Sequence, residues 1–217
     1  MAAGVVQCRT LRIPPMNTLS RLSTLLLDLH GQAEALSEAP LPERVFERLQ
    51  RALPFDSAMW ASGAATPQGP LFHSIHLQHQ PLQLLLDYEP LKQHDILFRQ
   101  CLESPGTSLR ANARTDLPPL FGPYLSKYGL EQALCTMTID PELSLVTGVS
   151  LYRSDAGRPF DDDEVELMQA VFPHLIDVER RELLLRLQRG QPQGSAWPSS
   201  LGACDDKGLL RLSLIHI

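Results

Sequence analysis

Three histidines, at positions 73, 76 and 79, form the pattern that comes nearest to a metal site, and His94 follows not far along the chain. Imidazole is a common zinc ligand. The segment that carries the three residues is expected to be a strand, however, and successive side chains of a strand point to opposite faces. His73 and His79 then share one face while His76 lies on the other. We therefore predict polar residues on a half-exposed strand and no metal site.

Four acidic residues in a row, 161–164, could suggest a cation site, but a calcium loop alternates its ligands with other residues. The same run fits the start of a helix. Asp161 can cap the first turn, and Glu164, three positions later, can be its reciprocal partner in a capping box. Phe160 and Val165 fit a hydrophobic staple across that cap. We predict that a helix begins here.

The sequence shows no arrangement of side chains typical of a catalytic centre or of a cofactor site. Ser57 and Ser126 do not lie in a Gly-x-Ser-x-Gly turn, and Gly122 and Gly129 are isolated glycines, not a phosphate-binding loop. The four cysteines are far apart, which excludes a Cys-x-x-Cys motif. We expect a protein that is not an enzyme, although folding could still bring distant residues together.

Charge and hydropathy restrict the class of partner. The net charge is -6, so the surface repels phosphates and is a poor nucleic-acid surface by itself. No apolar run approaches the roughly 20 residues that a membrane span needs, and the apolar core expected of a signal peptide does not follow Arg9 and Arg12. We expect a cytoplasmic protein with no membrane partner.

The elements that must position any site follow from the spacing of apolar residues. Leucines at helical intervals predict a helix from Leu19, and a second helix runs from Pro42 to just before Pro54. Apolar and β-branched runs around the turn signal Asp140-Pro141-Glu142 predict a hairpin at the centre of an antiparallel sheet. The remaining expected elements are strands 57–61, 71–77 and 107–111, short helices within 81–103 and 117–129, hairpin strands 133–139 and 145–152, and a last helix from 161 to about 189.

Several stretches resemble the N-terminal sensor domains of LuxR-type transcription regulators, which have GAF- or PAS-like folds. The resemblance covers about residues 17–189 and implies an α+β fold, with a central antiparallel sheet flanked by helices and with long N- and C-terminal helices. The stretches are Leu53 to Ala58 followed by Trp60, Tyr124 to Leu134 followed by Thr136 to Asp140, Leu151 to Arg153 followed by Pro159, Phe160 and Glu164, and Phe172-Pro173-His174-Leu175.

The resemblance also implies a domain layout. Residues 1–16 are expected to be a flexible leader, 17–189 the sensor domain, and 190–211 a linker with the start of a missing downstream region. Residues 212–217 match one reading frame of a sequencing-library adapter and are expected to be an artefact. The helix-turn-helix by which such regulators read DNA is not found in this sequence. We therefore expect a C-terminally truncated regulator that reaches DNA only through the missing domain.

The function implied is that of the regulatory part of a bacterial LuxR-type regulator, which would bind a small effector and pass the signal on through its last helix. The alternative is a stand-alone ligand-binding or enzymatic protein on a GAF-like scaffold, because fold alone does not fix function.

A ligand pocket, if the protein has one, is expected between the sheet and the short helices of residues 81–128. Each candidate lining residue, taken singly, is more simply explained as plain core. The candidates are Trp60, Phe72, Tyr88, Phe98, Phe121, Tyr124 and Met137.

Leucines on the first and last helices have two possible uses. They could pack against each other within one chain, or they could form a bundle with the same helices of a second copy, which predicts a homodimer. The candidates for this helix surface are Leu22, Leu26, Leu183, Leu184 and Leu187.

Overall fold

The computed structural model describes residues 18–30, 39–140 and 144–188, with two short strands beyond them, β6 (Ala203–Cys204) and β7 (Leu210–Arg211). The expected leader, 1–16, and the expected artefact, 212–217, lie outside the described residues. So does the expected linker, apart from those two strands.

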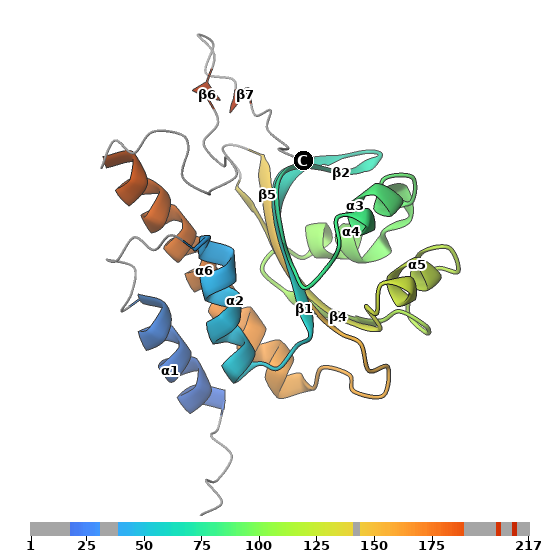
Figure 1. Ribbon diagram of the computed structural model, residues 1–217, viewed down its shortest axis with the longest axis horizontal. Coiled ribbons are helices and arrows are strands. Elements are labelled where there is room, and N and C mark those ends of the chain that lie inside the picture. The colour runs from blue at the N-terminus through green and yellow to red at the C-terminus, as the bar shows by residue number, and fades with distance from the viewer. Residues whose placement is uncertain (1–17, 31–38, 141–143, 189–202, 205–209, 212–217) are drawn as a thin grey trace, which may run out of the picture.

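A five-stranded antiparallel sheet separates two layers of helices (Figure 1), as the α+β prediction requires. The strand order is β2-β1-β5-β4-β3, so the predicted hairpin, β4 and β5, does lie inside the sheet. The strands are β1 (Ser57–Thr66), β2 (Gly69–Gln78), β3 (Ser108–Asn112), β4 (Gln132–Asp140) and β5 (Leu145–Arg153).

The two long terminal helices and α2 cover one face of the sheet, and the short helices cover the other (Figure 1). This division gives the protein two cores, one on each side of the sheet. The first layer is α1 (Thr18–His30), α2 (Leu41–Ala52) and α6 (Asp162–Gln188). The second is α3 (Gln83–Tyr88), the 3₁₀ turn η1 (Lys92–His94), α4 (Ile96–Glu103) and α5 (Phe121–Lys127).

Helix α6 begins with the capping box predicted from the sequence. The backbone N–H of Glu164 donates to Asp161 Oδ1 at 2.8 Å, and the backbone N–H of Asp161 donates to Glu164 Oε2 at 3.0 Å. Phe160 is buried and Val165 packs against the same core, as a hydrophobic staple requires. The acidic run is therefore a helix start.

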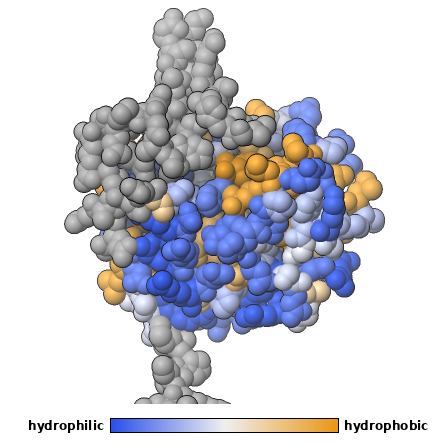
Figure 2. Space-filling model, in the orientation of Figure 1, coloured by the Kyte–Doolittle hydropathy of each residue, from blue (hydrophilic) through white to orange (hydrophobic). Residues whose placement is uncertain are grey.

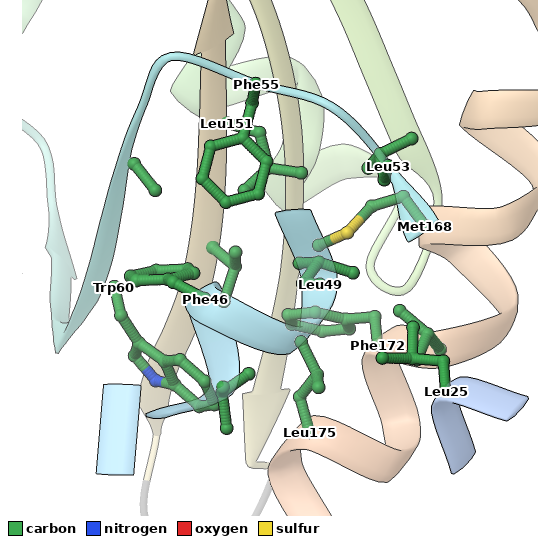
Figure 3. Close-up of a cluster of buried hydrophobic side chains, with 14 of the residues drawn as sticks. Leu25, Phe46, Leu49, Leu53, Phe55, Trp60, Leu151, Met168, Phe172 and Leu175 are labelled. Carbon is green, nitrogen blue, oxygen red and sulfur yellow. The ribbon is translucent and has the colours of Figure 1, made fainter. Parts of the chain in front are cut away.

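Aromatic and leucine side chains from three helices fill the core under α2 and α6 (Figure 3). Phe46 and Leu49 of α2 are fully buried, and Phe172 and Leu175 reach them from α6. Helix α1 joins this layer through Leu25 and Leu29. Nε2 of its last residue, His30, lies 3.4 Å from Nδ1 of His174 on α6. Packing within one chain therefore accounts for the inner faces of α1 and α6.

Strands β1 and β2 are longer than predicted and contain a β-bulge. Ser62 pairs with Ser74 whereas Gly63 pairs with Phe72, so His73 is an extra residue on β2. The small residues of 62–66 have low β-propensity, and the strand pattern did not reveal them. The expectation that His73 and His79 share one face of a strand is therefore wrong. The alternation of side chains is interrupted at His73, and His79 lies beyond the end of β2.

Among the described residues, no group of three His, Cys, Asp or Glu side chains is arranged to hold a metal ion. No helix within the described ranges is both long and apolar enough to cross a membrane.

Candidate ligand-binding site

A cavity lies between the sheet and the short helices α3, α4 and α5. The cavity has a volume of about 80 Å³. A single water molecule needs roughly 10–15 Å³, so the cavity is large enough for a small molecule. Its walls are mostly apolar side chains from β1, β4 and β5 below and from α3, α4 and α5 above.

Six of the seven candidate residues line this cavity: Phe72, Tyr88, Phe98, Phe121, Tyr124 and Met137. Four of them form a continuous aromatic wall. The ring of Tyr88 lies 5.9 Å from Phe72 and 6.1 Å from both Phe121 and Tyr124, and the last two are 5.5 Å apart. Rings at these separations attract each other beyond simple burial.

Trp60 does not line the cavity, and its assignment to the pocket was wrong. Its ring packs 6.1 Å from Phe46 in the core under α2 (Figure 3), on the opposite face of the sheet. Its neighbours on β1, Met59 and Ala61, line the cavity instead, because successive side chains of a strand point to opposite faces. The alternation was visible in the sequence, but not which face the pocket occupies.

Asp95 places a carboxyl group in this otherwise apolar wall. It caps α4 by accepting the backbone N–H of Phe98 at 2.9 Å, and Tyr88 Oη donates to it at 2.9 Å. Burial raises the pKa of Asp95, because removal from water disfavours the charged form. Sequence reasoning missed this residue. Its place just before α4 marks it as a cap, whereas its burial depends on the whole fold.

Two rows of residues form the cavity floor on the sheet. In the first, Met59, Ser150 and Cys135 lie side by side on β1, β5 and β4; we call this the Ser150 row. In the next, two residues further along each strand, are Ala61, Gly148 and Met137, the Gly148 row.

Burial raises the pKa of Cys135 and of Tyr152, and the negative charge of Asp95 adds to both shifts. Burial likewise raises the pKa of the Cys101 thiol to about 12. Neither buried thiol is a thiolate at neutral pH, so neither is an activated nucleophile.

Hydrogen bonds between α3 and α5 hold the helical wall of the cavity together. Tyr124 Oη donates to the backbone oxygen of Leu84 at 2.9 Å, and Tyr128 Oη donates to Asp87 at 2.7 Å. Lys127 forms an ion pair with the same carboxylate, and the pKa of Asp87 is lowered by these donors. Figure 2 shows a hydrophobic patch in a mostly hydrophilic surface. Leu71 of β2, Leu82 just before α3 and Leu86 of α3 are exposed large apolar side chains.

The candidate helix surface is only partly exposed. Leu22 and Leu26 pack against the core under α2 and α6, and Leu183 is half-buried. Leu184 is 58% exposed. Two leucines of α1 that were not among the candidates are also exposed, Leu19 at 74% and Leu27 at 73%. The side chain of Leu187 lies outside the described residues.

Comparison of the sequence with family models and with curated proteins finds no match. Solved structures do match. CepR2, an N-acylhomoserine lactone dependent LuxR-family transcription factor from Burkholderia cenocepacia, is 19% identical with a TM-score of 0.56, over 77% of this chain and 98% of that one. SdiA from Escherichia coli is 15% identical with a TM-score of 0.55, over 86% and 74%.

A GAF domain outside that family is similar to the same degree. The phycoerythrobilin-bound GAF domain of a cyanobacterial phytochrome is 14% identical with a TM-score of 0.51, over 79% of this chain and 98% of that one. At such low identities the likeness concerns the fold. The chain therefore has the fold that LuxR-family regulators share with GAF domains, as its resemblance to the sensor domains of LuxR-type regulators predicted.

Proposed function

We propose that this chain is the effector-sensing part of a cytoplasmic LuxR-type transcription regulator and that it binds a small amphipathic molecule in the cavity. The observation that carries the proposal is the cavity itself, an apolar space of about 80 Å³ with a buried carboxyl group in its wall. Small-molecule sites are typically concave and apolar, with a few polar groups that fix orientation. A helix-turn-helix that reads DNA would lie outside residues 1–217.

The lining favours a ligand with a polar head and an aliphatic or aromatic remainder. The head would lie near Asp95 and Ser150, where it can donate a hydrogen bond to the carboxyl oxygen. Two of the matched proteins are described with ligands of this kind: CepR2 depends on N-acylhomoserine lactone, and SdiA has been solved with octanoyl-rac-glycerol. Binding without reaction is supported by Cys135, the cysteine of the cavity lining, because burial raises the pKa of its thiol and so disfavours the reactive thiolate.

Binding is tested by calorimetry with N-octanoyl homoserine lactone and with octanoyl-rac-glycerol as probes. We expect at least one probe to bind, with a negative heat-capacity change from burial of apolar surface. Ala61→Phe puts a ring into the cavity floor and should weaken that binding by about tenfold or more, the equivalent of roughly 1.4 kcal/mol.

The matched control is Trp60→Phe, one position earlier on the same strand. It changes an aromatic ring on the opposite face of the sheet and should leave the affinity unchanged. Equal loss of binding in both variants, or no binding of either probe to the wild-type chain, would count against a ligand site in this cavity.

Self-association through α1 and α6 is a further part of the proposal, since exposed leucines on both helices would be covered in an interface. These leucines are Leu19 and Leu27 of α1 and Leu184 of α6. Sedimentation velocity should show a dimer at micromolar concentration, and Leu27→Asp should shift the species to a monomer. A wild-type chain that stays monomeric throughout the concentration series would remove this part of the proposal.

A further inference from the structure

In the Gly148 row, two of the three residues on the cavity floor have a very small side chain or none. Ala61 on β1 and Gly148 on β5 have almost no side chain, so the sheet backbone is nearly bare there. Met137, their neighbour on β4, is the one long side chain in this row. Its surroundings therefore decide how much of the space above the backbone stays open.

The side chain of Met137 lies across Gly148. A Cβ atom at position 148 would come within 2.8 Å of Met137 Cγ, 3.5 Å of Cε and 3.6 Å of Sδ. The methionine side chain thus occupies the space above Gly148. Because residue 148 has no side chain, Met137 can lie close to the sheet backbone. Methionine is unbranched and flexible, so this side chain can change rotamer more readily than the aromatic wall opposite.

Two polar residues of the floor, Ser150 and Cys135, lie in the row before this methionine. Beyond it the floor continues with Ser62 and then with Gly63 and Val146. Consecutive rows on one face are about 7 Å apart, so a chain attached to a head at the Ser150 row reaches Met137 within a few carbon atoms.

We propose that Met137, lying across Gly148, sets the length of aliphatic chain that the cavity accepts. This inference rests on the proposed function and deepens it. An apolar chain that extends from the Ser150 row must stop at Met137 or displace it. Removing the methionine opens the floor as far as Val146, whereas a side chain at 148 pushes the methionine up into the cavity.

The test measures the affinity of purified protein for N-acyl homoserine lactones with straight acyl chains from butanoyl to tetradecanoyl. In the wild-type chain, affinity should rise about fourfold for each added methylene and then level off at one chain length. In Met137→Ala the rise should continue to longer chains before it levels off. In Gly148→Ala it should level off earlier, and the double variant Gly148→Ala/Met137→Ala should level off later than Gly148→Ala alone.

Val149→Ala is the matched control. Val149 is the next residue on β5, fully buried on the opposite face, so its truncation destabilises the protein without touching the cavity. Its affinity profile should level off at the wild-type chain length. Thermal melts of all variants confirm that each one is folded at the temperature of the measurement.

The outcomes separate this inference from the proposed function. Wild-type binding with the same levelling-off point in every variant would overturn the role of Met137 and leave the ligand site intact. If no member of the acyl series binds the wild-type chain, and octanoyl-rac-glycerol does not bind either, the ligand site and the role of Met137 both fail.

Discussion

Arg153→Met is expected to lower the free energy of unfolding by about 4 kcal/mol, because it leaves a buried carboxylate without its partner. Arg153 ends β5 and is only 2% exposed, which is rare for an arginine. Its Nη2 forms an ion pair with Glu164 Oε1 at 2.6 Å, and Glu164 is itself 7% exposed. Urea or thermal unfolding at neutral pH measures the change.

The guanidinium also donates hydrogen bonds to backbone oxygens of two segments far apart in sequence. Nε and Nη2 donate to Pro54 O at 3.0 and 2.8 Å, and Nη1 donates to Pro159 O at 3.0 Å. Its Cζ lies 4.0 Å from the ring centre of Phe160, a cation–π contact. One side chain thus joins the end of β5, the connection from α2 to β1 and the start of α6.

Two further variants separate charge from packing. Arg181→Met removes an exposed i,i+4 ion pair with Asp177 on the same helix α6 and should cost no more than about 0.5 kcal/mol. The double variant Arg153→Met/Glu164→Gln keeps the capping acceptor but removes the unpaired charge. It should recover about 1–2 kcal/mol relative to additivity. A loss for Arg153→Met as small as that for Arg181→Met would contradict the role of the buried charge.

The parts of the fold that were predictable from the sequence are those set by short-range chemistry. The capping box of Asp161 and Glu164 depends on residues three positions apart, and it forms as expected. The β4–β5 hairpin was likewise marked by its own apolar runs and its turn. Such signals need no knowledge of what packs on the element.

The parts that could not be predicted depend on which face meets which core. Trp60 shows this. The alternation of side chains along its strand was clear from the sequence, but not which of the two layers of helices each face would meet. No local signal marks Asp95 or Arg153 as removed from water, because this depends on segments far apart in sequence that pack around them. The bulge at His73 is also invisible locally, since only pairing with β1 makes that residue an extra one.

Gly63→Ala is the second substitution with a large expected effect, a loss of about 3 kcal/mol in the free energy of unfolding. A Cβ atom at this position would lie 2.1 Å from the carbonyl oxygen of Leu71 and 3.0 Å from Cα of Phe72. Both are backbone atoms of the neighbouring strand, so no side-chain rotation relieves the clash. The hairpin must separate at the bulge or lose its pairing there.

The same substitution should also weaken ligand binding, because the bulge sets the face on which Phe72 lies. Gly63 pairs with Phe72, and both line the cavity beside Tyr88.

Gly157→Ala is the control for the loss of stability. Gly157 lies in an exposed loop, where the nearest atom to a new Cβ is Asp155 Oδ1 at 3.3 Å. That change should be neutral or stabilising by up to about 1 kcal/mol, since alanine reduces the entropy of the unfolded chain. Equal melting temperatures for Gly63→Ala and the wild-type chain would mean that β1 and β2 can pair without the bulge, and the cavity wall at Phe72 would then need another explanation.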